Sequence, residues 1–264
     1  MDKAQRHRVN AARVAIRNQM GFFDEWHGQV ASDWKADETR VTFADFAITE
    51  KLFAELRRSF PEDQFMSEET VIPDEEVAIE SRYLWVLDPI DGTNNYALGM
   101  PSCAISLALF KDGLPLYGLI YDGSTSELLE GGPQQPLLVN GRKVVPLEQA
   151  FPKRSGLVAL HFPLPESRVG DLHELFHKYR VRSLGSAALH LAYVALGRLD
   201  GALDEKVRIW DIAAAMCLLE AAGREIRFIG RNPLPLLQFS MKEAPLQYYA
   251  GNAAFLKEME NWLR

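Results

Sequence analysis

Cysteine is scarce in this chain, with only two among 264 residues, Cys103 and Cys217. Two cysteines cannot supply the disulfide framework of a small secreted protein, and both lie in apolar segments. We therefore expect two buried thiols in a reducing compartment, and a cytoplasmic protein.

Long hydrophobic runs and an excess of positive charge are also missing. No apolar stretch approaches the roughly 20 residues of a membrane span, and residues 1–20 are too polar for a secretory signal. Lys and Arg number 29 against 36 Asp and Glu, a net charge of -7. The sequence thus argues against a membrane or a nucleic-acid polymer as partner, while a small phosphorylated metabolite held through metal ions stays possible.

The chain is long enough for one large domain or two intimate halves, and 47% of it is hydrophobic. Apolar spacing predicts helices over residues 9–23, 44–56, 167–178, 186–196, 211–222 and 253–263. Short apolar runs predict strands over 63–67, 82–87, 157–161 and 225–229, near 181, and in an antiparallel meander over 103–145 closed by an Asn140-Gly141 hairpin. Residues 231–245 are expected to form a loop.

The most informative segment lies at residues 84–96. An apolar run ends in Asp88, Asp91 follows three residues later, and Gly92 and Thr93 open a new turn or helix. A carboxylate that closes a buried strand must be paired, hydrogen-bonded or bound to metal. Hard divalent cations prefer carboxylate oxygens, and free amides at a helix start attract anions. The segment therefore suits a divalent metal together with phosphate.

Three further acids stand at unusual places: Asp45 at a helix start, Glu69 after a short strand and Asp211 before an apolar helix. Taken singly, each has an ordinary structural explanation, as a first-turn acid, a solvated turn residue or an N-cap. Only their combination with Asp88 and Asp91 favours a functional site.

Four ordered motifs give the chain a family resemblance. The segment from Asp88-Pro89-Ile90-Asp91-Gly92-Thr93 to Asn95-Tyr96 resembles the signature of the inositol monophosphatase family, which comprises Mg²⁺-dependent, lithium-sensitive phosphomonoesterases. Three other segments match that family's remaining motifs: Val41-Thr42-x-Ala44-Asp45, Ser67-Glu68-Glu69-Thr70 and Trp210-Asp211-Ile212-Ala213-Ala214-Ala215. The likeness covers nearly the whole chain. It implies a layered α/β fold, an αβαβα sandwich, with an N-terminal α+β subdomain (1–147) carrying most metal ligands and a C-terminal α/β subdomain (148–264).

The resemblance also implies roles for individual residues. Glu69, Asp88 and the Ile90 carbonyl would hold one Mg²⁺ ion, and Asp88, Asp91 and Asp211 a second, with Glu69 adding to a weaker third site. The amides of Gly92 and Thr93 would bind phosphate, and Thr93 and Asp45 would orient or deprotonate the attacking water. By the same analogy Mn²⁺ would substitute for Mg²⁺, Li⁺ and Ca²⁺ would inhibit, and the protein would be a homodimer.

Substrate choice is the open part of the resemblance. Inositol monophosphate is the leading candidate substrate. The alternative substrates are fructose 1,6-bisphosphate, histidinol phosphate and adenosine 3′,5′-bisphosphate. A further alternative is a non-catalytic protein that binds a phosphorylated metabolite. Asp204 falls where inositol-specific members carry an acid that contacts a substrate hydroxyl, although it could equally be a solvated loop acid. Gly185, Ser186 and Ala187 would shape the pocket wall, or form only a tight helix start. The chain departs from the family pattern at Ser67, at Arg224 and over residues 227–241, none of which is a predicted ligand.

One motif points elsewhere. His173-Glu174-Leu175-Phe176-His177 satisfies the His-Glu-x-x-His pattern of zinc metalloproteases. The apolar face of this predicted helix comprises Leu172, Leu175, Phe176 and Tyr179, which leaves the histidines at its edge. We expect them to face solvent rather than to bind zinc.

Overall fold

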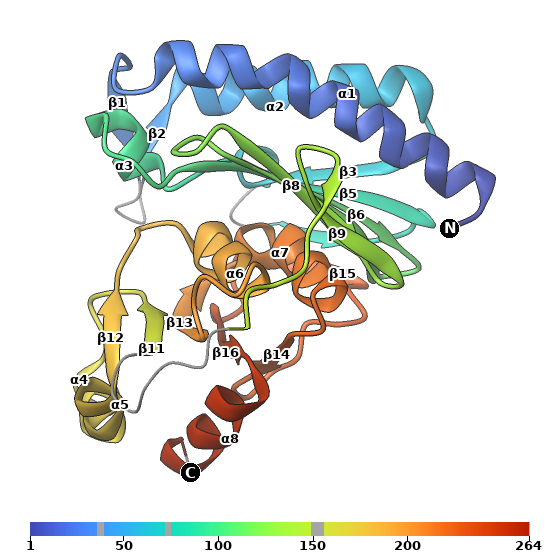
Figure 1. Ribbon diagram of the computed structural model, residues 1–264. Coiled ribbons are helices and arrows are strands. Elements are labelled where there is room, and N and C mark those ends of the chain that lie inside the picture. The colour runs from blue at the N-terminus through green and yellow to red at the C-terminus, as the bar shows by residue number, and fades with distance from the viewer. Residues whose placement is uncertain (36–39, 72–74, 149–155, 264) are drawn as a thin grey trace.

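Figure 1 shows the computed structural model, which describes residues 1–35, 40–71, 75–148 and 156–263. Its larger sheet has seven strands in the order β10-β9-β8-β7-β6-β5-β3. The strands are β3 (Gln64–Ser67), β5 (Tyr83–Asp91), β6 (Ala104–Lys111), β7 (Leu114–Asp122), β8 (Glu127–Gly132), β9 (Gln135–Val139) and β10 (Arg142–Lys143). All neighbours pair antiparallel except β3 and β5, which run parallel.

Two helices, α1 (Lys3–Trp26) and α2 (Phe43–Ser59), cover one face of this sheet. Their apolar stripes, which include Ile16, Phe23 and Leu52, share a core with alternate residues of the strands, such as Trp85 and Leu87 on β5. The neighbouring residues Leu84 and Val86 belong to the core on the other face. Strand β5 is therefore buried on both sides, as its uninterrupted apolar sequence predicts.

A second pair of helices, α6 (Ala187–Ala195) and α7 (Ile209–Ala221), lies between the larger sheet and a five-stranded sheet (Figure 1). Helix α7 is rich in alanine, so it approaches the larger sheet closely. A Cβ atom at Gly118 of β7 would lie only 2.2 Å from the carbonyl oxygen of Ala214. Small residues on both sides of this contact thus bring the start of α7 near the end of β5.

The five-stranded sheet has the order β12-β11-β13-β16-β14. Its strands are β11 (Gly156–Leu160), β12 (Tyr179–Arg182), β13 (Gly201–Val207), β14 (Glu225–Phe228) and β16 (Leu246–Gly251). Its outer face packs against α4 (Glu166–Asp171), α5 (His173–Lys178) and α8 (Ala253–Trp262). Helices and sheets therefore alternate in five layers, and the predicted αβαβα sandwich is confirmed.

Smaller elements complete the chain. They are β1 (Ser32–Trp34), β2 (Arg40–Thr42), β4 (Glu76–Ala78), β15 (Gln238–Ser240), the 3₁₀ turn η1 (Glu68–Thr70) and helix α3 (Thr93–Leu98). Strands β1 and β2 form one two-stranded sheet, and β15 and β4 form another. The proposed boundary after residue 147 lies beside residues 149–155, outside the described part of the chain, so that division stays a prediction.

The structure corrects three sequence-based expectations. The helix expected over residues 167–178 is two short helices separated at Leu172. The expected loop at 231–245 contains β15, whose pairing with β4 lies far away in sequence. Strands β13 and β16 were not predicted, because their formation depends on pairing with neighbouring strands more than on the apolar pattern of their own residues. The predicted antiparallel meander and its Asn140-Gly141 hairpin are confirmed.

Both cysteines are free and buried, as expected. Among the described helices, none combines the length and the apolar character that crossing a membrane would require.

Candidate active site

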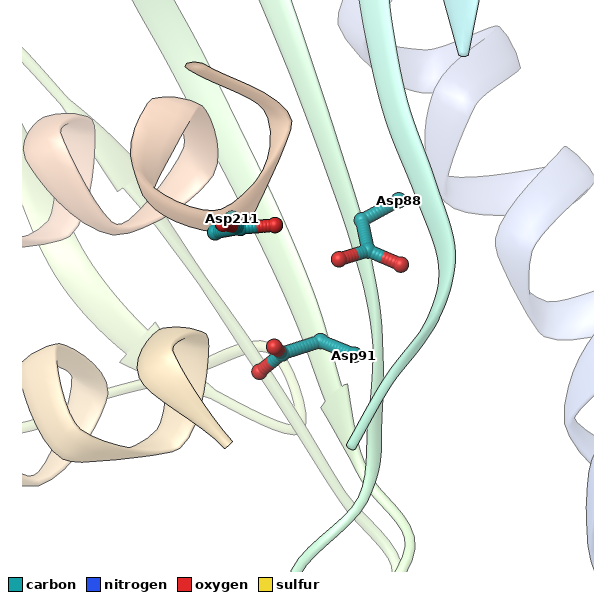
Figure 2. Close-up of side chains that lie close together, drawn as sticks. All are labelled: Asp88, Asp91 and Asp211. Atoms are coloured by element: carbon teal, nitrogen blue, oxygen red, sulfur yellow. The ribbon is translucent and has the colours of Figure 1, made fainter. Parts of the chain in front are cut away.

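Three aspartates, of which Asp88 and Asp91 are buried and Asp211 is half-buried, converge where the larger sheet meets α7 (Figure 2). Asp88 and Asp91 come from the end of β5, and Asp211 is the third residue of α7. One carboxylate oxygen from each lies within 4.8 Å of the other two. Three residues predicted from sequence as metal ligands are therefore brought together.

The backbone of β5 explains why both its acids reach one side. Pairing with β6 is regular up to Asp88 and shifts register between Asp88 and Asp91, which breaks the alternation of side chains along a strand. The Ile90 amide donates to Asp88 Oδ1 at 3.1 Å, and the Thr93 hydroxyl donates to the Ile90 carbonyl at 2.9 Å. This turn fixes the Asp88 carboxylate and the Ile90 carbonyl relative to each other.

Asp91 is held by the start of α6. Its carboxylate accepts hydrogen bonds from the Ser186 hydroxyl, from the Ala188 amide at 2.8 Å and from the Ala187 amide at 3.3 Å. Ser186 is itself the N-cap of α6 and is fully buried. The helix start thus orients a carboxylate through charge-assisted hydrogen bonds. Asp211 is oriented similarly, because its Oδ2 accepts from the Arg208 amide at 2.7 Å.

The electrostatics of the three aspartates favour a cation. Burial raises the pKa of Asp91 to about 7, and burial with mutual repulsion raises the pKa of Asp88 and Asp211 well above the ordinary value. Within the described residues, no Lys, Arg or His forms an ion pair with any of the three. Three carboxylates that lie together, two of them buried, are unfavourable without a countercharge, and hard divalent cations bind such oxygens. The donor set therefore fits Mg²⁺.

Asp45 lies at the N-terminus of α2, where its Oδ2 accepts from the amide and the hydroxyl of Thr42, both at 2.7 Å. This arrangement is a capping box and confirms the ordinary first-turn interpretation. The second oxygen, Oδ1, is buried without a hydrogen-bond partner among the described residues. Burial, together with the charges of Glu69 and Glu68, raises the pKa of Asp45 to about 7. The carboxylate thus caps a helix and leaves one buried oxygen without a partner among the described residues, although Asp45 does not line the cavity described below.

The structure separates the two adjacent glutamates. Glu68 lines the cavity beside Asp88, whereas Glu69 is not among the lining residues. The reason is the parallel register of β3 and β5, which pairs Ser67 with Leu87 and so brings the next residues, Glu68 and Asp88, to the same edge. Both glutamates also accept from the Lys35 ammonium, at 2.7 Å for Glu68 and 2.6 Å for Glu69. Of the two glutamates, only Glu68 lines the cavity, and the ligand role assigned to Glu69 from the sequence stays a prediction.

The cavity in front of the aspartates has a volume of about 170 Å³. Of the predicted site residues, the following line it: Asp88, Ile90, Asp91, Gly92, Thr93, Gly185, Ala187, Asp204 and Asp211. Ser186 lies behind the wall, where it bonds to Asp91. Gly92 has φ +87° at the N-cap of α3, and a Cβ there would lie 2.8 Å from the Ser102 carbonyl oxygen, which explains the glycine.

Asp204 sits on β13 and is buried, not solvated. Its Oδ1 accepts from the Lys206 amide at 3.0 Å, and its Oδ2 has no hydrogen-bond partner in the described chain. His161 Nδ1 lies 3.7 Å from Oδ2. Burial is the main cause that raises the pKa of Asp204. An unsatisfied oxygen facing a cavity can accept a hydrogen bond from a ligand.

Four charged or titratable lining residues were missed from sequence: Arg40, Glu68, His161 and Lys206. Strand alternation gave no signal for Lys206, because β13 was not predicted and its pairing with β16 shifts register between Asp204 and Val207. No local signal marked Arg40 or His161 either. His173 and His177 lie outside the cavity, and the His173 side chain is 70% exposed, so the solvent-facing interpretation is confirmed for it.

A layered α/β sandwich with a carboxylate cluster lining a small polar cavity is an architecture that suits a metal-dependent phosphatase. Residues 2–260 match the model of the inositol monophosphatase family, and the chain belongs to that family of phosphomonoester hydrolases.

Individual relatives of this chain are named as phosphatases, in agreement with the family match. An inositol-1-monophosphatase from Mesorhizobium japonicum is 34% identical, with 81% of each chain covered. A fructose-1,6-bisphosphatase from Pyrococcus furiosus is 38% identical over 58% of this chain and 59% of its own. The solved structure of an inositol monophosphatase from Anabaena superposes with a TM-score of 0.79 at 26% identity, covering 99% of this chain and 96% of that one.

Proposed function

We propose that this protein hydrolyses a small phosphate monoester in a Mg²⁺-dependent reaction, with inositol monophosphate as the leading substrate. The observation that carries the proposal is the cluster of Asp88, Asp91 and Asp211, which forms no ion pair with a Lys, Arg or His of the described residues. Divalent cations stabilise such a cluster by offsetting the repulsion between its carboxylates.

In this proposal Asp88, Asp91 and Asp211 hold the metal together with the Ile90 carbonyl and Glu68. Glu68 takes the place that we first gave to Glu69, because it is Glu68 that lines the cavity. Bound metal ions would neutralise the phosphate, lower the pKa of water and stabilise the leaving oxygen. Three points remain predictions: that two or three ions bind, that Mn²⁺ can replace Mg²⁺, and that Li⁺ and Ca²⁺ inhibit the enzyme.

The protein groups around the cluster serve the attacking water and the phosphate. Asp45 Oδ1 has no partner among the described residues, and a pKa raised to about 7 suits a proton acceptor near neutral pH. Thr93 donates its hydroxyl proton to the Ile90 carbonyl, so its oxygen can accept a hydrogen bond from water. Gly92 and Thr93 line the cavity, and their amides would bind the phosphate.

Asp204 would face the leaving group. Its unpartnered Oδ2 can accept a hydrogen bond from a substrate hydroxyl, which favours a polyol phosphate. The named relatives act on inositol monophosphate and on fructose 1,6-bisphosphate, so both substrates remain candidates for this chain. Histidinol phosphate and adenosine 3′,5′-bisphosphate remain as less favoured alternatives.

The test is phosphate release from a panel of these four esters, measured with Mg²⁺ and with EDTA. Mg²⁺-dependent release from at least one ester is the expected result. Binding of an ester without release from any of them would instead favour the non-catalytic relative.

We also retain the homodimer and the cytoplasmic location as proposals. Light scattering at micromolar concentration would test the first, with a mass near twice the 29.8 kDa of one chain expected. Fractionation of the source cells would test the second.

A further inference from the structure

The segment 236–243 overlaps the stretch in which the sequence departs from the family pattern, and it has no part in the site described so far. Its strand, β15, pairs antiparallel with β4. The Leu237 carbonyl accepts a hydrogen bond from the Ile79 amide at 2.9 Å. The Leu236 amide donates to the Gly113 carbonyl at 2.8 Å. Residues of the N-terminal half of the chain thus hold this segment in place.

The turn between β6 and β7 fits closely against the same segment. Gly113 in that turn has φ +77°, and a Cβ there would lie 3.0 Å from the Leu236 carbonyl oxygen. A glycine permits both this backbone conformation and this close approach. The Leu236 side chain is buried in the core that α6 and α7 share with the larger sheet. The segment is therefore a packed part of the fold.

Arg208 connects this segment to the carboxylate cluster. Its guanidinium donates through Nη1 to the Glu243 carbonyl at 2.7 Å and through Nη2 to the Met241 carbonyl at 3.4 Å. Its backbone amide donates to Asp211 Oδ2 at 2.7 Å. One residue thus binds the segment with its side chain and a predicted metal ligand with its backbone.

Trp210 makes a second connection through packing. It precedes Asp211 at the start of α7, and its ring centroid lies 5.1 Å from that of Phe239 on β15. Both rings are buried in the same core. Because a close-packed interior transmits a change in one side chain to its neighbours, the first turn of α7 depends on Phe239 for its position.

We propose that the segment 236–243 positions Asp211 for metal binding, through the Arg208 side chain and the contact between Trp210 and Phe239. The inference rests on the proposed function, whose metal site needs the Asp211 carboxylate beside those of the two aspartates on β5. Neither Arg208 nor Phe239 lines the cavity, so both are positioning residues. Residues that orient a metal ligand affect metal affinity although they do not touch the ion.

The first test changes the packing without changing any charge. Phe239→Leu removes the ring that lies against Trp210, and we expect Mg²⁺ affinity, measured by isothermal titration calorimetry, to fall about 10-fold. Phe255→Leu is the matched control. Phe255 is also buried, but it packs on Tyr179 at the outer face of the five-stranded sheet, with ring centroids 5.8 Å apart. This control should lose stability in urea and keep its Mg²⁺ affinity.

The second test uses Arg208, for which charge and position predict opposite results. Removing a positive charge near the carboxylates would by itself strengthen Mg²⁺ binding. Loss of the two carbonyl contacts should instead weaken it, so we expect a severalfold fall in affinity for Arg208→Gln. Arg208→Lys keeps the charge and should fall between this variant and the wild type. Arg224→Gln, which removes a guanidinium beyond the other end of α7, is the control and should leave the affinity unchanged.

The results separate this inference from the function on which it rests. Unchanged or higher Mg²⁺ affinity in Phe239→Leu and Arg208→Gln would overturn the inference while leaving the metal site intact. A fall of the same size in Phe255→Leu would also overturn it, because the loss would then follow general stability. Absence of Mg²⁺ binding to the wild-type protein would instead refute the metal site of the proposed function.

Discussion

The Ser186 hydroxyl donates a hydrogen bond to Asp91, which joins the start of α6 to the end of β5 across 95 positions in the sequence. The segment that precedes Ser186 is held by two further hydrogen bonds, both at Leu184. The Leu184 amide donates to His190 Nε2 at 2.9 Å, and Asn95 Nδ2 donates to the Leu184 carbonyl at 2.7 Å. A predicted metal ligand is thus oriented by residues that do not themselves line the cavity.

Removing this hydrogen bond should weaken metal binding. Ser186→Ala deletes a donor to Asp91 and also the N-cap of α6, where the Ser186 oxygen accepts from the Leu189 amide at 3.2 Å. We expect Mg²⁺ affinity to fall about 10- to 100-fold and the free energy of unfolding to fall by about 1 kcal/mol. Isothermal titration calorimetry and urea unfolding would measure these. Asn252→Ala, which removes the N-cap of α8, is the control that should lose stability without losing affinity.

Asp88 is the most sensitive single position. Asp88→Asn removes one charge from the cluster with little change in volume, so the protein should stay folded while turnover falls below detection. Phosphate release and circular dichroism would measure the two properties together. Near-normal turnover in a folded Asp88→Asn protein would refute the metal assignment.

The two adjacent glutamates provide a matched pair. Glu68 lines the cavity and Glu69 does not, although both bind Lys35. Glu68→Gln should therefore lower Mg²⁺ affinity and kcat/KM by about 10- to 100-fold, and Glu69→Gln should have a clearly smaller effect. Titration of activity against Mg²⁺ concentration would compare them. A larger loss of Mg²⁺ affinity in Glu69→Gln than in Glu68→Gln would instead assign the ligand role to Glu69.

Mg²⁺ should stabilise the protein more strongly as the pH rises. Burial raises the folded-state pKa of Asp91 from 3.8 to about 7, and burial with the neighbouring carboxylates raises the pKa of Asp88 and Asp211 well above the ordinary value. Between the unfolded and folded pKa values the folded protein binds more protons, so without metal its stability falls as the pH rises from about 4 through 7. Metal binding favours the ionised carboxylates and offsets this loss.

Thermal unfolding with EDTA and with Mg²⁺, from pH 5 to 8, would measure this difference. His190 acts in the opposite direction, because burial lowers its pKa to about 3 and stability falls as the pH drops below about 6.5. That contribution is common to both conditions and cancels in the difference. A Mg²⁺ effect independent of pH would contradict the prediction.

His190 itself should matter for stability. It is fully buried, and its Nε2 is the acceptor for the Leu184 amide. His190→Leu would leave that amide without an acceptor, at a cost of about 1–3 kcal/mol. His190→Gln offers a carbonyl in its place and should lose less. Urea unfolding of both variants at pH 7.5 would measure the costs, and equal stability of the two would argue against the role of this hydrogen bond.

Local pattern was sufficient for much of the fold. The helical spacing in residues 9–23, the apolar run before Asp88 and the Asn140-Gly141 turn each specify one element by themselves, and the structure confirms all three. Prediction failed where pairing with a distant segment decides the element. Strand β15 exists through its pairing with β4, and β13 and β16 exist through each other.

The same division holds for the site. The sequence by itself determined which acids are candidates, because Asp88, Asp91 and Asp211 stand at the ends of buried elements, where a carboxylate must be paired, hydrogen-bonded or bound to metal. Only the tertiary structure decided which neighbours share the cavity. The parallel register of β3 against β5 brings Glu68 beside Asp88, and the meeting of β2, β13 and the end of β11 brings Arg40, Lys206 and His161 to one cavity. Those choices depend on contacts between segments remote in the sequence, which local spacing does not encode.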